Sequence, residues 1–173
     1  MISTIFIGLI IIYCLYLVPS FNLLFNVFSD FGWYDKTANI FNFGLIFKGF
    51  LDCIFVWHAN RELKIKDWRV KLFLYLPMVT FMFIGFFPKF PLRPIHWTFV
   101  FISFVTWILS QYIYAKYSKN ETFMGQTRFL IIVEIIFLVF LFSNRLFWGI
   151  AELFIMTLFV TWLWRFQKIL FKH

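Results

Sequence analysis

Charged residues and cysteines are scarce in this sequence. Charged side chains make up 14% of the 173 residues and hydrophobic ones 62%, whereas soluble domains carry about 25% charge. No polar stretch is long enough to form a separate soluble catalytic domain. The two cysteines, Cys14 and Cys53, both lie within apolar stretches, so a disulfide framework is not indicated. This composition argues against a water-soluble protein.

Motifs for catalysis, metals and nucleic acids are also lacking. The histidines, His58, His96 and His173, are scattered, and no H-E-x-x-H pair occurs, so no metal site is expected. No G-x-S-x-G motif is present, and no serine has a recognisable local base. Nucleic-acid binding would need a folded basic surface with base-reading elements. We therefore predict no metal, no other cofactor and no nucleic-acid partner, and a non-enzymatic role is favoured although an enzyme stays open.

Long apolar runs occupy most of the chain. Each helix that crosses a bilayer needs about 20 mostly apolar residues, and the runs are separated by clusters of charge, proline and asparagine. We predict an all-α integral membrane protein, a bundle of six transmembrane helices in one domain over residues 1–173. The predicted spans are Ile2–Phe25, Thr37–Trp57, Leu72–Phe87, Trp97–Ala115, Phe129–Phe142 and Leu146–Trp164.

Three of these spans have particular features. The first lacks a basic leading segment and a small-residue cleavage site, so we expect a retained span rather than a signal peptide. The third and fifth are short for a bilayer, and their helices are expected to extend into the flanking residues. Pro19 and Pro77 fall within predicted spans, where each removes a backbone donor.

Lysine and arginine are distributed unevenly over the connectors, which predicts the orientation. Eleven lie on the side of the termini: Arg61, Lys64, Lys66, Arg69, Lys71, Lys116, Lys119, Arg128, Arg165, Lys168 and Lys172. Four lie on the other side: Lys36, Lys89, Arg93 and Arg145. This bias places both termini in the cytoplasm, with anionic lipid headgroups as counter-charge. The inner (plasma) membrane of a cell is the expected location, and an organellar membrane stays open.

A few ionisable residues lie inside the predicted spans. Such a residue costs about 2.5–3.5 kcal/mol at the bilayer centre, so it is normally paired, turned inward or functional. Lys48 and Asp52 are four residues apart and can share one helical face. Glu134 is predicted at a similar depth, where Lys48 could bridge the two carboxylates. The three residues are candidates for an intramembrane charge cluster, either a proton-coupled site or a static packing network.

A second group of polar residues lies towards the predicted outer side. Asparagine can hydrogen-bond across helices, and a histidine beside a carboxylate can act as a general base or contact a lipid phosphate. An interfacial histidine that caps its own helix is the plainer interpretation. The candidates for one outward-facing pocket are Asn39, Asn42, Arg93, His96, Arg145 and Glu152.

Short motifs carry a resemblance over nearly the whole chain. They are S-D-F-G at Ser29–Gly32, A-N-I-F-N-F-G-L-I-F-K-G at Ala38–Gly49, and G-F-F-P at Gly85–Pro88 followed by His96. In these the chain resembles a prokaryotic family of six-span membrane proteins, domain of unknown function 998, which is similar to the eukaryotic Frag, DRAM and Sfk group.

The resemblance implies a compact six-helix fold and a role in lipid organisation, membrane trafficking or stress responses, with no established reaction. It implies small-residue positions at Gly44 and Gly49, and a proline and histidine at Pro88 and His96. This chain departs from the family pattern at Lys48, between the two glycines, which weakens any direct transfer of mechanism.

Four functions stay open on the sequence alone. The first is a lipid-interacting protein of membrane homeostasis, with membrane lipids as partners. The second is an accessory subunit of a larger membrane complex, with membrane-protein partners. The third is a small proton-coupled carrier or channel that uses Lys48, Asp52 and Glu134. The fourth is an intramembrane lipid enzyme, with His96 as base and Glu152 as its partner.

Overall fold

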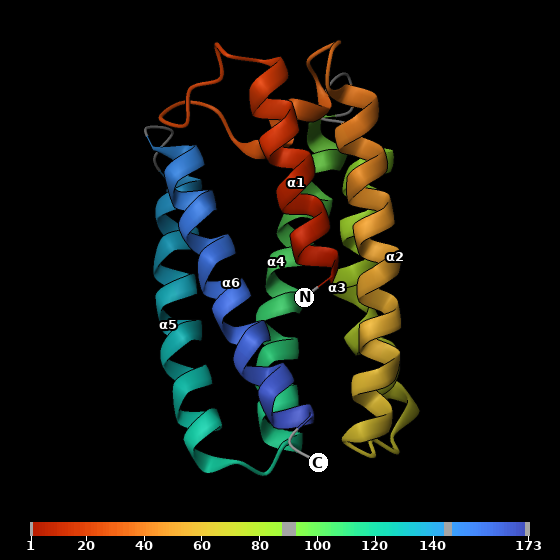
Figure 1. The fold of residues 1–173 in the computed structure, drawn as a ribbon. Helices are drawn as coiled ribbons and strands as arrows, with labels where there is room; N and C mark the ends of the chain where they lie inside the picture. Colours follow the sequence, from red (N-terminus) through yellow and green to blue (C-terminus); the bar gives the residue numbers. More distant parts are fainter. Residues whose placement is uncertain (1, 88–92, 144–146, 172–173) are drawn as a thin grey trace. The chain divides into compact units, whose positions relative to one another are not determined.

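The computed structural model describes residues 2–87, 93–143 and 147–171, and within these ranges all regular structure is helical (Figure 1). The predicted all-α class is confirmed. Five helices, α2 to α6, are long and apolar enough to cross a membrane, whereas α1 is a shorter apolar helix. The elements are α1 Ile2–Leu17, the 3-10 helix η1 Phe28–Gly32, α2 Ala38–Glu62, α3 Trp68–Phe86, α4 Arg93–Tyr117, α5 Glu121–Ser143 and α6 Trp148–Leu170.

The first helix is shorter than predicted. A helix from Ile2 to Phe25 was expected, but α1 ends at Leu17. Pro19 explains the end, because it lacks a backbone N–H and its ring disfavours helical geometry at Val18. The apolar residues that follow Pro19 therefore form a loop and do not extend the helix. The expected extension of the two short spans is confirmed, since α3 begins at Trp68 and α5 at Glu121.

The contacts divide the chain into two compact units, and the single domain predicted over residues 1–173 stays a prediction. The α1–α3 unit comprises Ile2–Ser20 and Ser29–Ser110, and so includes the first part of α4. The α5–α6 unit comprises Phe21–Phe28 and, as far as the structure describes it, Gln111–His173.

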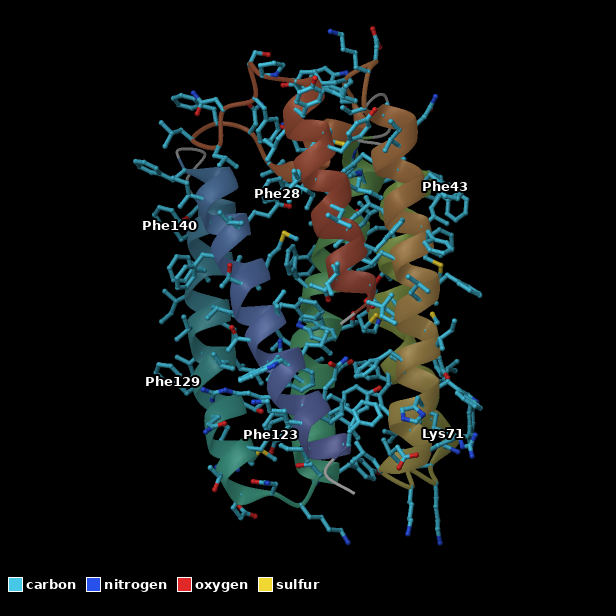
Figure 2. All side chains as sticks on the ribbon, in the orientation of Figure 1. Phe28, Phe43, Lys71, Phe123, Phe129 and Phe140 are labelled. Atoms are coloured by element: carbon cyan, nitrogen blue, oxygen red, sulfur yellow. The ribbon has the colours of Figure 1, made fainter. Side chains whose placement is uncertain are left out.

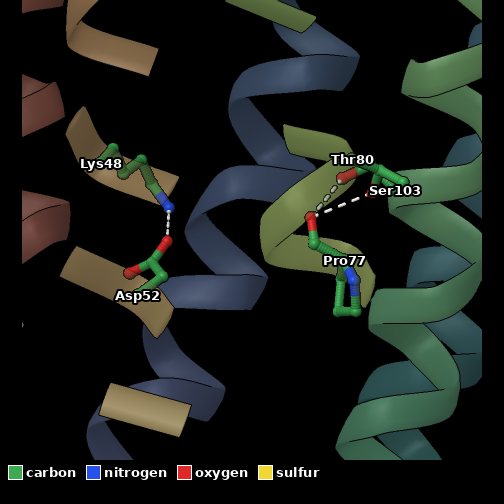
Figure 3. A network of polar contacts seen from close by, with 5 residues as sticks. All are labelled: Lys48, Asp52, Pro77, Thr80 and Ser103. Carbon is green, nitrogen blue, oxygen red and sulfur yellow. Dashed lines mark hydrogen bonds and ion pairs between the residues drawn. The ribbon is translucent and has the colours of Figure 1, made fainter. Parts of the chain in front are cut away.

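In the α1–α3 unit, α2 packs against both α1 and α3 (Figure 1). Small residues allow the helices to approach: the Ile10 side chain of α1 covers Gly44, and a Cβ at Gly49 would lie 3.0 Å from the Met78 carbonyl oxygen of α3. The Pro77 carbonyl oxygen of α3 accepts hydrogen bonds from the hydroxyls of Thr80 (3.1 Å) and of Ser103 (3.3 Å) in α4, which ties α4 to α3 (Figure 3).

The turn between α2 and α3 has defined caps at both ends. The Ile65 N–H donates to the Asn60 carbonyl (3.1 Å) and the Lys64 N–H to the Arg61 carbonyl (3.0 Å), while Lys64 has a φ of 50°. This is the Schellman arrangement that ends many helices. Asp67 then caps α3, because its side chain accepts a hydrogen bond from the Arg69 N–H at 2.8 Å. The turn thereby holds five residues in a fixed geometry.

In the α5–α6 unit, α5 and α6 run side by side (Figure 1) around an aromatic core. The rings of Tyr114, Phe123, Trp162 and Phe166 contact one another with centroids 4.9–6.4 Å apart. The Trp162 indole N–H donates to the buried Thr127 hydroxyl at 3.0 Å. The core therefore satisfies the polar atom of its largest side chain.

The helices also expose many large apolar side chains. In α2 the exposed residues recur every three or four positions, so they form one face, and the opposite face contains Lys48 and Asp52. Phe43 points away from α1, and Phe129 and Phe140 of α5 point away from α6 (Figure 2). This pattern is the reverse of a water-soluble helix. The exposed apolar face of α2 consists of Ile40, Phe43, Phe47, Phe50, Ile54 and Trp57.

Candidate functional site

A buried ion pair lies within α2. The Lys48 ammonium contacts the Asp52 carboxylate, as the four-residue spacing predicts (Figure 3). Lys48 is 7% exposed and Asp52 is 6% exposed. The Lys48 ammonium also lies 4.6 Å from the centroid of the Phe81 ring of α3, a cation–π geometry. The pair thus neutralises itself inside the α1–α3 unit.

Glu134 has a partner that the sequence analysis did not name. The Gln111 side-chain N–H₂ donates to both carboxyl oxygens of Glu134, at 2.9 and 2.8 Å. Gln111 and Glu134 are 0% and 1% exposed. Sequence analysis did not single out Gln111, although it is a polar side chain inside a predicted span, which is the signal that could have identified it. The cluster of Lys48, Asp52 and Glu134 stays a prediction, since Glu134 belongs to the α5–α6 unit.

Three residues of the predicted outer pocket each contact the backbone of a connector. The Asn42 amide donates to the Gly32 carbonyl (3.3 Å), and the His96 Nδ1 lies 2.8 Å from the Phe87 carbonyl oxygen. The Glu152 carboxylate accepts from the Phe28 N–H (2.5 Å), so it ties the loop before η1 to α6. In each case a side chain stabilises a nearby connector.

The remaining outer candidates are Asn39, Arg93 and Arg145. Asn39 and Arg93 are exposed. Arg145 lies outside the described residues, as does Pro88. The outer pocket as a single site therefore stays a prediction, and the contacts of its described members are typical of connectors that are held in place.

A cavity lies at the α2–α3 turn. It has a volume of about 540 Å³, within the range of about 300–1,000 Å³ that is usual for ligand sites. We call it the α2–α3 pocket, and it is lined by Trp57, Asn60, Arg61, Lys64, Ile65, Lys66, Lys71 and Tyr75.

Sequence analysis used the cations of this pocket as an orientation signal, with anionic lipid headgroups as their counter-charge, and predicted no pocket. The Schellman turn that gathers them has Lys64 in a left-handed conformation, where glycine or asparagine is the usual residue. A lysine there gives no sequence signal for the turn. The four cations in and beside a five-residue connector were the sequence signal that could have indicated a cationic pocket.

No metal-binding cluster of three His, Cys, Asp or Glu side chains occurs in the described ranges. Comparison of the chain with family models, with curated proteins and with solved structures gave no match. The resemblance to domain of unknown function 998 stays a prediction, and function is argued below from the chain's own residues.

Proposed function

We propose that this chain is a lipid-binding integral membrane protein that contributes to membrane homeostasis. The observation that supports the proposal is the outward-facing apolar surface of the helices, with side chains such as Phe43 and Phe129 exposed and the charged pair Lys48–Asp52 turned inward. Such a surface is stable only against lipid or against another apolar surface. Acyl chains are the partner that every exposed helix face would share.

We further propose six spans with both termini in the cytoplasm, in an inner (plasma) membrane. The 16 residues of α1 extend about 24 Å at 1.5 Å per residue, a few ångströms short of a hydrocarbon core of about 30 Å. Local thinning or flanking residues accommodate such a mismatch. With six spans, the bias of eleven lysines and arginines against four gives this orientation.

Native mass spectrometry of the gently purified protein tests the lipid-binding proposal. We expect lipid to remain bound in stoichiometric amounts after the detergent is removed. A protein that carries a fixed partner subunit and no lipid would contradict the proposal and would identify an accessory subunit of a larger complex. Detection of the protein with neither a partner subunit nor bound lipid would also contradict it.

The Gln111–Glu134 pair favours a second candidate, a proton-coupled carrier. A buried carboxyl within a membrane-spanning helix is a usual element of proton relays. Gln111 Oε1 makes no hydrogen bond in the ranges that the structure describes, so the amide can donate to an ionised carboxylate or, after turning over, accept from a protonated one. The pair could thus hold Glu134 in both protonation states.

Proton flux into vesicles that contain the purified protein tests the carrier. If it operates, an imposed pH gradient drives flux that Glu134→Gln abolishes, because an amide at this position cannot release a proton. Glu121→Gln is the matched control, since Glu121 is exposed in the first turn of the same helix. Absence of flux, or equal flux in both variants, would exclude this mechanism.

A further inference from the structure

The α2–α3 pocket has a one-sided charge. Four of its lining residues are cationic, Arg61, Lys64, Lys66 and Lys71, and none is acidic. Like charges gathered in one concavity raise the local potential and attract anions. Lys71 lies at the end of the unit where α2 joins α3 (Figure 2). The free energy of bringing these cations together would be offset by an anionic ligand.

The fold holds this arrangement in place. The hydrogen bonds from Lys64 and Ile65 to the last turn of α2 fix the backbone of the pocket floor, and Ile65 is 2% exposed. The Arg61 guanidinium lies 4.9 Å from the centroid of the Trp57 ring, which restrains its side chain. The Arg61 guanidinium and the backbone that carries Lys64 therefore start from ordered positions, which lowers the entropic cost of binding.

Asn60 adds neutral donors and an acceptor to the pocket. Its side chain is 5% exposed and lies close to Tyr75, yet neither its amide nitrogen nor its oxygen meets hydrogen-bond geometry with any described residue. A buried amide without a hydrogen bond costs roughly 1–3 kcal/mol. Asn60 lines the pocket, so a ligand with phosphate or hydroxyl oxygens would satisfy it once the side chain turns towards the opening.

Exposed tryptophans indicate that the pocket lies at the level of lipid headgroups. Trp57 and Trp68 at the ends of α2 and α3 are 52% and 66% exposed, and exposed tryptophans of spanning helices concentrate at the membrane–water interface. On the N-terminal side of the pocket, α2 carries its exposed apolar face. A ligand with a charged head and acyl chains would fit both parts, whereas a free phosphate ion would occupy a small fraction of about 540 Å³.

We propose that the α2–α3 pocket binds the phosphate-bearing headgroup of an anionic phospholipid. This site deepens the proposed lipid-binding function and rests on it. Basic pockets between spanning helices on the cytoplasmic side are a known setting for such headgroups. The headgroup phosphate contacts the lysines, Asn60 hydrogen-bonds its oxygens, and the acyl chains lie along the apolar face of α2.

The test uses the full chain in nanodiscs of equal parts phosphatidylcholine and phosphatidylglycerol. Native mass spectrometry then gives the ratio of the two lipids that stay bound. We expect enrichment of phosphatidylglycerol in the wild-type protein. Lys71→Gln should reduce the enrichment about fivefold and Lys66→Gln/Lys71→Gln about 25-fold, with about one fivefold factor for each cation that contacts the headgroup phosphate directly.

Arg69→Gln is the matched control. Arg69 lies in the same turn of α3 as Lys71 and carries the same charge, but it does not line the pocket. We expect the Arg69→Gln variant to enrich phosphatidylglycerol as much as the wild-type protein does. An equal loss in Arg69→Gln and Lys71→Gln would indicate diffuse surface attraction and would overturn the proposal.

Three further results separate the possible failures. Release of phosphatidylglycerol by millimolar inorganic phosphate would identify a site for soluble phosphate and would overturn the lipid assignment. Bound lipid with no enrichment in the wild-type protein would reject this pocket while leaving the proposed function intact. Absence of any bound lipid would reject both.

Discussion

Replacing Lys48 by methionine is expected to lower the free energy of unfolding by about 3–5 kcal/mol, the usual cost of removing one member of a buried ion pair. Methionine fills a similar volume, so the loss comes from the Asp52 carboxylate, which is 6% exposed and contacts Lys48. Titration of the detergent-solubilised protein with sodium dodecyl sulfate, followed by tryptophan fluorescence, measures the change.

Substitution of the other member of the pair, Asp52→Leu, should lower the free energy of unfolding by less. In Asp52→Leu the Lys48 ammonium keeps the Phe81 ring, 4.6 Å from the ring centroid, and a desolvated cation–π contact contributes up to about 2 kcal/mol. The double variant Lys48→Met/Asp52→Leu should recover most of the stability, because well-packed apolar residues often replace a buried ion pair without loss. The double-mutant cycle thus isolates the coupling of the pair.

An additive cycle would contradict this account. If the double variant lost the sum of the two single losses, Lys48 and Asp52 would each act through other neighbours. If all three variants were as stable as the wild-type protein, the pair would lie in water, as a hydrated channel would require. Either outcome would favour a role of Lys48 and Asp52 in transport over a role in helix packing.

The sequence was sufficient to predict the helical class and most helix positions. Uninterrupted apolar runs leave a helix as the one spanning structure that satisfies every backbone group without closing a barrel. The error in the first helix came from hydropathy, which treats Phe21 and Phe25 as continuing the run that begins at Ile2. Backbone chemistry at Pro19 overrides composition there, and α1 ends at Leu17.

The candidate sites were less predictable, because they depend on partners far apart in the chain. The Lys48–Asp52 pair follows from spacing along one helix. The Gln111–Glu134 pair joins α4 to α5, and no local pattern specifies which polar side chain of one helix faces which of another. The α2–α3 pocket depends on a left-handed lysine, a conformation that tertiary context imposes on a residue that rarely adopts it.

Gly85→Ala is expected to destabilise the protein although alanine is the better helix former. A Cβ at position 85 would lie 2.6 Å from the Asn42 carbonyl oxygen and 3.2 Å from the Leu45 Cβ. Both atoms are fixed by the backbone of α2, so α3 must move away from α2. Overpacking of this kind costs about 1–3 kcal/mol, whereas the gain in helix propensity is at most about 1 kcal/mol.

Gly8→Ala is the matched control, because Gly8 lies in α1 of the same unit and a Cβ there would meet nothing within 4 Å. Its expected effect has the opposite sign, a gain of about 0.8–1 kcal/mol from helix propensity alone. The same titration measures both variants. Stabilisation of both would mean that α2 and α3 do not approach closely at Asn42, and the α2–α3 pocket, which depends on the packing of these two helices, would lose its structural basis.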